Sequence, residues 1–152
     1  MSESGSSLLG DISIEQLIAK SPLFKNLDDE GRKRLLEGGT LENYPPGTVI
    51  CKEGDPGDAF FFIKTGAVEV STSHGGNKVK LADLAAGDFF GEVSVITAQP
   101  RTATVTALSP VVAVKFQRRK ISRVLMDYPE VTKLLNAQIE NRAADTISKL
   151  VK

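Results

Sequence analysis

The chain has 152 residues, of which 19 are basic and 19 acidic, so its formal net charge is zero. Its 41% hydrophobic and 25% charged residues are typical of one globular domain with a single core. The balanced charge argues against a nucleic-acid binder that depends on phosphate neutralisation. No apolar run is long enough to span a membrane, and no secretory signal is visible. With Cys51 as the only cysteine, we expect a cytoplasmic protein without an intramolecular disulfide.

The N-terminal part predicts a tail followed by two short helices. Residues 1–10 are rich in Ser and Gly, which predicts a flexible tail. Residues 11–20 carry apolar side chains at helical spacing. A second helix is predicted over residues 28–37, with Asp28 as its N-cap and with a Gly-Gly pair ending it.

From residue 40 to residue 116 the pattern changes to short strands separated by turns. Pro45-Pro46-Gly47 and the segment 54–58 predict turns, and Gly75-Gly76-Asn77 predicts a tight hairpin. Thr and Ala/Val alternate directly after Arg101, which predicts a strand that begins at once. About eight such strands at this spacing predict a β sandwich or jelly-roll barrel.

Helical periodicity returns after Gln117. One helix is predicted over residues 118–126, and Pro129 suits the first turn of the last helix. The last helix carries an apolar residue at every fourth position: Val131, Leu135, Ile139, Ala143 and Ile147. A spacing of four drifts around a helix, so we expect this stripe to meet more than one surface.

The expected fold class is therefore mainly β with flanking α. We expect a single domain over residues 11–152, with helices in 11–38, an eight-stranded jelly-roll barrel in 40–116 and two helices in 118–152.

Residues 90–105 contain the groups of an anion-binding site. Gly91 permits close approach of a ligand to the backbone, and Arg101 offers a planar, two-pronged donor to an anion. Glu92 would repel a bare phosphate, but it suits a ligand that also carries a hydroxyl. A phosphate combined with a sugar hydroxyl indicates a nucleotide.

This stretch resembles the phosphate-binding cassette of cyclic nucleotide-binding domains. The family pattern is approximately F-G-E-hydrophobic-small-hydrophobic, a variable spacer, and then P-R-x-A-[TS]-V. The matching residues are Phe90, Gly91, Glu92, Val93, Ser94, Val95, Pro100, Arg101, Ala103, Thr104 and Val105. The resemblance extends from about Pro22 to about Leu150.

The resemblance implies a role for each part of the site. The cyclic phosphate is implied to contact Arg101, Thr102 and Ala103. The ribose is implied to contact Gly91, Glu92, Val93 and Ser94, with the Glu92 carboxylate accepting from the 2′-hydroxyl. The base is implied to contact Thr102, Val70, Val79, Leu81 and Arg142. The valines and Leu81 are equally well explained as core residues, and Arg142 as a surface residue.

The implied ligand is cAMP or cGMP. In the family, a hydroxyl at the position of Thr102 can bond the guanine amino group of cGMP, yet many domains with Ser or Thr there prefer cAMP. We therefore favour cAMP and keep cGMP open.

The implied function is a regulatory sensor without catalytic residues, metal or cofactor. The last helix would close over the ligand as a lid, and the C-terminal helices would relay occupancy to an unidentified effector. Binding to nucleic acid or insertion into a membrane is not expected from this chain.

Two alternatives stay open at this point. A cupin-like metalloenzyme would share the barrel, but it usually needs several histidines, and His74 is the only one. The chain could also be the sensor fragment of a larger transcription factor, channel or kinase-regulating protein. DNA binding would then have to come from residues outside this sequence.

Overall fold

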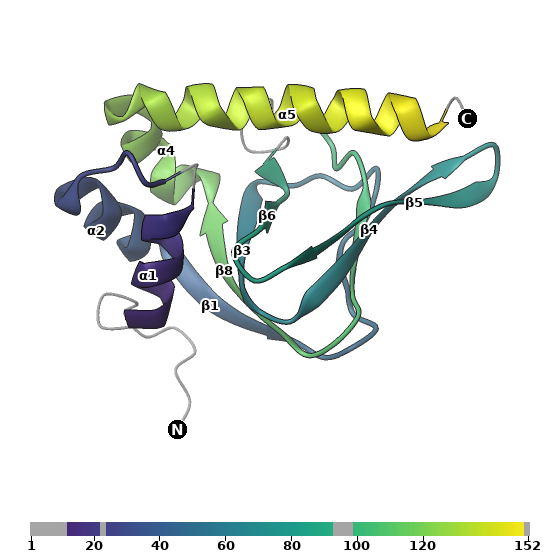
Figure 1. Cartoon of the computed structure of the whole chain (residues 1–152), viewed down its shortest axis with the longest axis horizontal. Helices are drawn as coiled ribbons and strands as arrows, with labels where there is room; N and C mark the ends of the chain where they lie inside the picture. Colours follow the sequence, from purple (N-terminus) through teal and green to yellow (C-terminus); the bar gives the residue numbers. More distant parts are fainter. Residues whose placement is uncertain (1–11, 22–23, 93–98, 151–152) are drawn as a thin grey trace.

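The computed structural model describes residues 12–21, 24–92 and 99–150. In that part of the chain, eight strands form two four-stranded sheets, and helices gather at one end and along one side of them (Figure 1). This arrangement confirms the expected mainly β jelly-roll fold with flanking helices. The tail predicted for residues 1–10 lies outside the described residues.

The two sheets are antiparallel and each joins strands that are distant in the sequence. The first has the order β1-β8-β3-β6 and the second the order β2-β7-β4-β5. The strands of the first sheet are β1 (Gly39–Tyr44), β8 (Val111–Gln117), β3 (Ala59–Thr65) and β6 (Phe89–Phe90). The strands of the second sheet are β2 (Val49–Cys51), β7 (Thr104–Ala107), β4 (Ala67–His74) and β5 (Asn77–Ala85).

The helices pack against one end of the barrel, except for the last, which runs on across it (Figure 1). They are α1 (Ile12–Lys20), α2 (Asp29–Glu37), α4 (Arg118–Asp127) and α5 (Pro129–Leu150). Asp28 caps α2 as predicted, because its Oδ1 accepts from the Gly31 N–H at 2.7 Å. The same oxygen accepts from the Tyr128 hydroxyl at 2.8 Å, which ties the start of α2 to the junction between α4 and α5.

The hairpin between β4 and β5 combines a tight turn with an irregular register. Gly75 and Gly76 form its two-residue loop with φ values of 62° and 83°, as a turn with two left-handed residues requires. Nearer the barrel, Val70 pairs with Ala82, whereas Ser71 pairs with Lys80. Leu81 is therefore an extra residue on β5, which is a β-bulge.

The strand predicted to start directly after Arg101 begins later, at Thr104. The reason is that the backbone of Arg101 bonds a loop instead of a strand. Its N–H donates to the Asp55 carbonyl at 2.8 Å, and its carbonyl accepts from the Gly54 N–H at 2.9 Å. Thr102 and Ala103 consequently precede the sheet ladder.

The core has two parts. One fills the helical end of the barrel and includes Phe60, Phe62 and Phe116, and the other fills the barrel interior around Phe61 and Phe90. Val131 and Leu135 of α5 are buried in the first part, where each large apolar side chain contributes about 1.5–3 kcal/mol. The later residues of the stripe lie over the barrel, so the expected contact with two surfaces is confirmed.

Candidate ligand-binding site

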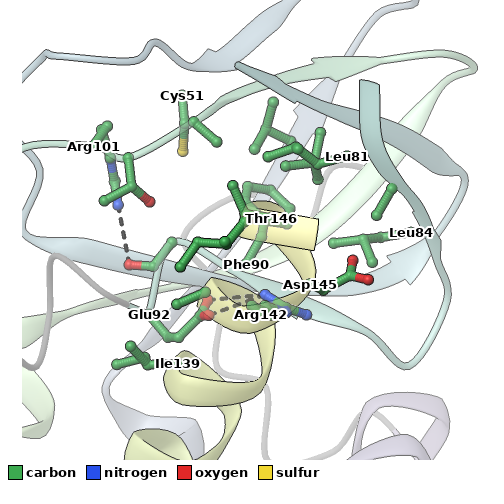
Figure 2. A pocket seen from close by; sticks show the side chains of 18 residues that line it. Cys51, Leu81, Leu84, Phe90, Glu92, Arg101, Ile139, Arg142, Asp145 and Thr146 are labelled. Atoms are coloured by element: carbon green, nitrogen blue, oxygen red, sulfur yellow. Dashed lines mark hydrogen bonds and ion pairs between the residues drawn. The ribbon is translucent and has the colours of Figure 1, made fainter. Parts of the chain in front are cut away.

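A cavity of about 380 Å³ opens between the barrel strands and the C-terminal half of α5 (Figure 2). This volume lies within the range of small-molecule sites. Most lining side chains are apolar, and two arginines and two carboxylates are the charged exceptions. The lining residues from the barrel side are Cys51, Val70, Leu81, Ala82, Leu84, Phe90, Gly91, Glu92, Arg101, Thr102, Ala103 and Val105. Those from α5 are Ile139, Arg142, Ala143, Asp145, Thr146 and Ile147.

Arg101 lies in a slot that two glycines leave open. A Cβ on Gly57 would stand 2.2 Å from the Arg101 Nε, and one on Gly91 would stand 2.9 Å from its Nη1. Gly91 also has a φ of 84°, which favours glycine. The Arg101 Nη1 donates to the Gly91 carbonyl at 3.1 Å, and its Cζ lies 5.9 Å from the centre of the Phe61 ring. Among the described residues the Gly91 carbonyl is the one acceptor of its side chain, so other N–H groups of the guanidinium can meet an anion.

Sequence reasoning missed Gly57. The segment 54–58 predicts only a turn, although its backbone and Gly57 together hold Arg101 in place. The sequence did contain a signal for this role, because Gly57 is a second glycine in the segment and a simple turn requires only one.

The Glu92 carboxylate is buried, with only 2% of the residue exposed. Each of its oxygens accepts from the Arg142 Nη1 at 3.1 Å. The Arg142 Nη2 donates to the Phe89 carbonyl at 2.8 Å, and its Cζ lies 5.1 Å from the centre of the Phe89 ring. Figure 2 shows this ion pair at the bottom of the cavity, where α5 runs across the cavity.

The expected contact of Arg142 with the base stays a prediction. In the structure its guanidinium pairs with Glu92, the residue expected to hold the ribose. The physical reason is that a buried carboxylate needs a charged partner, and Arg142 is the cation that faces it. Arg142 therefore joins α5 to the Glu92 side of the cavity.

Two of the three apolar residues expected at the base lie in the cavity wall. Val70 and Leu81 line the cavity, whereas Val79 does not. In a regular strand, side chains on the same face as Val79 and Leu81 would follow at residues 83 and 85. The bulge at Leu81 instead shifts this set to Ala82 and Leu84, which line the cavity in their place. Figure 2 shows Leu81 and Leu84 on the side of the cavity away from Arg101.

Thr102 and Ala103 also line the cavity, near Arg101. Thr102 is exposed and Ala103 is half-buried. Because both precede β7, their N–H groups do not belong to its ladder. Val93 and Ser94, the remaining residues expected at the ribose, lie outside the described residues.

Cys51 and His74 play different parts in the structure. Cys51 is buried in the cavity wall, and burial raises the pKa of its thiol to about 11. His74 is exposed in the hairpin. Within residues 12–21, 24–92 and 99–150, no three His, Cys, Asp or Glu side chains are grouped as metal ligands would be.

The barrel, its cavity and the helix across it define a small-molecule binding domain. The cyclic nucleotide-binding domain model matches residues 41–128, which is more than half of the chain. The chain belongs to the cyclic nucleotide-binding domain family. This family consists of regulatory binding domains, and the assignment leaves the cupin-like alternative without support.

Known relatives include channels and kinase subunits. A cyclic nucleotide-gated potassium channel of Mesorhizobium japonicum is 33% identical over 85% of this chain and 35% of its own length. A cAMP-dependent protein kinase regulatory subunit of Blastocladiella emersonii is 34% identical over 76% of this chain and 29% of its own length. The structure of the Thermus thermophilus catabolite activator protein gives a TM-score of 0.76 at 29% identity, covering 86% of this chain and 62% of that one.

The chain spans about a third of the length of these two curated relatives. In the part of the chain that the structure describes, no helix has the length and apolar character needed to cross a membrane.

Proposed function

We propose that this chain binds a cyclic nucleotide, with cAMP favoured over cGMP, and acts as a regulatory sensor that makes and breaks no bond. The observation that carries the proposal is that Arg101 and Glu92 face one cavity, whose opposite wall is apolar and whose open side is crossed by α5. A cyclic nucleotide has the three matching parts, namely a phosphate, a hydroxylated sugar and a flat base.

The phosphate is assigned to Arg101 and to the backbone of Thr102 and Ala103. The slot between the two glycines holds the guanidinium in one orientation before ligand arrives, which reduces the ordering cost of binding. The small side chain of Ala103 permits a close approach to its N–H.

The ribose is assigned to Gly91, Glu92, Val93 and Ser94. A carboxylate offers about four lone-pair sites, and Arg142 contacts each oxygen of Glu92 once. The 2′-hydroxyl can therefore donate to Glu92 while the ion pair with Arg142 persists. In this arrangement the ligand and the lid share one carboxylate.

The base is assigned to the wall of Val70, Leu81, Ala82 and Leu84. This wall is apolar and does not distinguish adenine from guanine. The Thr102 hydroxyl would be used by the guanine amino group and stay idle toward adenine. Similarity to a regulatory subunit of a cAMP-dependent kinase supports cAMP.

Signal transmission is assigned to α5 and α4. Ligand that prefers the state with α5 closed shifts the protein toward that state, and the buried start of α5 contacts the helical core that contains α1, α2 and α4. Because relatives include a channel and a kinase subunit, we propose that this chain serves a larger assembly whose effector is not identified. The buried free thiol of Cys51 suits a reducing compartment, so we place this activity in the cytoplasm.

The first test removes the phosphate contact. Titration calorimetry with cAMP and cGMP should show that Arg101→Ala lowers affinity roughly tenfold to a hundredfold, since a hydrogen bond to a charged group contributes about 1.5–3 kcal/mol. Arg123→Ala, which removes an exposed arginine far from the cavity lining, is the matched control. Unchanged affinity in folded Arg101→Ala protein would contradict the assignment.

The second test concerns the ribose. Wild-type protein should bind 2′-deoxy-cAMP more weakly than cAMP, and Glu92→Gln should weaken cAMP binding. The two losses should not add, because both changes remove the same hydrogen bond. Additive losses would show that Glu92 acts elsewhere than on the 2′-hydroxyl.

A further inference from the structure

The second half of α5 is held to the barrel by two cations. Its buried residues end at Leu135, and beyond that point Arg142 bonds Glu92 and Phe89. Lys149 follows Arg142 by two helical turns and therefore lies on the same side of the helix. Its ammonium donates to the carbonyl oxygen of Leu81. Four of the α5 residues that line the cavity lie between these two contacts: Ala143, Asp145, Thr146 and Ile147.

The acceptor of Lys149 is the bulge of β5. Leu81 has no partner residue in the register between β4 and β5, since its two neighbours pair with consecutive residues of β4. A backbone carbonyl that leaves a regular ladder at a bulge needs another donor. Lys149 supplies that donor from α5.

The same residue of β5 also forms the wall of the cavity. The Leu81 side chain is buried against the cavity, while its carbonyl faces the lysine. Asp145, which lines the cavity from α5, accepts from the Lys149 ammonium at 2.7 Å. Lys149 thus joins a residue of the lid to a residue of the wall without lining the cavity itself.

We propose that Lys149 is a positioning residue for the nucleotide base. It fixes the end of α5 against the bulge, so that the gap between Leu81 and α5 keeps the width of a flat base. This proposal rests on the proposed function, and it assigns to Lys149 a task that differs from that of Arg142, which pairs with Glu92.

A simpler explanation is that Lys149 only stabilises the helix through its ion pair with Asp145. Their side chains are 34% and 59% exposed, and such a pair contributes little to stability. That explanation predicts no effect on ligand binding, and it does not involve Leu81. The two explanations can therefore be separated by experiment.

The test compares Lys149→Met, which keeps the aliphatic chain but removes the donor, with Lys149→Arg, which keeps a donor. Lys133→Met is the control, since Lys133 is on the same helix and its side chain is 72% exposed. Amide hydrogen exchange over residues 143–150 is measured without nucleotide. Dissociation rates of cAMP, and competition by ribose 3′,5′-cyclic phosphate, which lacks a base, are measured in parallel.

We expect Lys149→Met to accelerate exchange over residues 143–150 and to increase the cAMP dissociation rate about three- to tenfold, the effect of one partly exposed hydrogen bond. Affinity for the base-free ligand should stay unchanged, and Lys149→Arg should behave like wild type.

Two results would overturn the proposal. In the first, Lys149→Met matches Lys133→Met in both exchange and dissociation. In the second, the base-free ligand loses as much affinity as cAMP, because Lys149 would then hold the lid as a whole. Wild-type protein that binds neither ligand would contradict the proposed function instead, and the exchange data would still decide whether Lys149 holds α5 to β5.

Discussion

The ion pair between Glu92 and Arg142 predicts a measurable coupling between the barrel and its lid. Two unit charges about 4 Å apart attract by roughly 4 kcal/mol at an effective dielectric constant of 20, whereas exposed pairs contribute only about 0.2–1 kcal/mol. The Glu92 side chain is 3% exposed and that of Arg142 is 32% exposed, so desolvation of the carboxylate offsets part of the attraction. We therefore expect a coupling free energy of about 1–3 kcal/mol.

The assay is a double-mutant cycle with Glu92→Gln, Arg142→Gln and the combined variant, each unfolded in urea without nucleotide. The pair between Arg34 and Asp127, at 2.8 Å and with side chains 25% and 46% exposed, is the comparison, and its coupling should be smaller. Added salt should reduce the coupling of the exposed pair more than that of the buried one. A coupling between Glu92 and Arg142 below about 0.5 kcal/mol, or one equal to the comparison pair, would refute this reasoning.

Three further predictions follow from single residues. Gly57→Ala should weaken cyclic nucleotide binding about as much as Arg101→Ala with the fold retained, because its Cβ would occupy the place of the guanidinium; normal affinity would show that Arg101 needs no slot. Cys51, with a pKa of about 11, should react slowly with iodoacetamide at pH 8 and still more slowly with cAMP present; the rate of a free thiol would contradict its burial. Asp28→Ala should lower the melting temperature by roughly 2–4 °C at neutral pH. Hydrogen bonds from the Gly31 N–H and then the Tyr128 hydroxyl lower the pKa of Asp28. The stability that the Asp28 carboxylate contributes is therefore present above its unfolded pKa and is lost as the pH falls through its folded pKa. If wild type and Asp28→Ala still differ in melting temperature in acid, the ionised carboxylate is not the cause of the difference.

The features that could be predicted from the sequence are those that local chemistry fixes. Asp28 caps a helix because its side chain reaches an N–H three residues later. The glycine pair closes a hairpin because two left-handed residues are needed there. The apolar stripe of α5 indicated two contact surfaces because its spacing differs from the helical repeat.

The features that could not be predicted depend on contacts between distant segments. Neither the bulge at Leu81 nor the absence of Val79 from the cavity lining follows from an alternating pattern. The slot for Arg101 depends on a glycine from a loop far away in the sequence. The pairing of Arg142 with Glu92 depends on the path of α5 across the barrel, which helical periodicity leaves undetermined.

The continuity of α5 makes this helix a mechanical lever. Its first turn is fixed, because Val131 is buried and the adjoining Tyr128 is bonded to Asp28. At 1.5 Å per residue, Lys149 lies about 30 Å from Pro129, so a tilt of about 10° at the first turn would move Lys149 by roughly 5 Å. A displacement of about 5 Å at the far end of α5 thus corresponds to a rotation of about 10° at its first turn. The same rotation would therefore be a small movement for a partner bound near the first turn and a large one for a partner bound near Lys149.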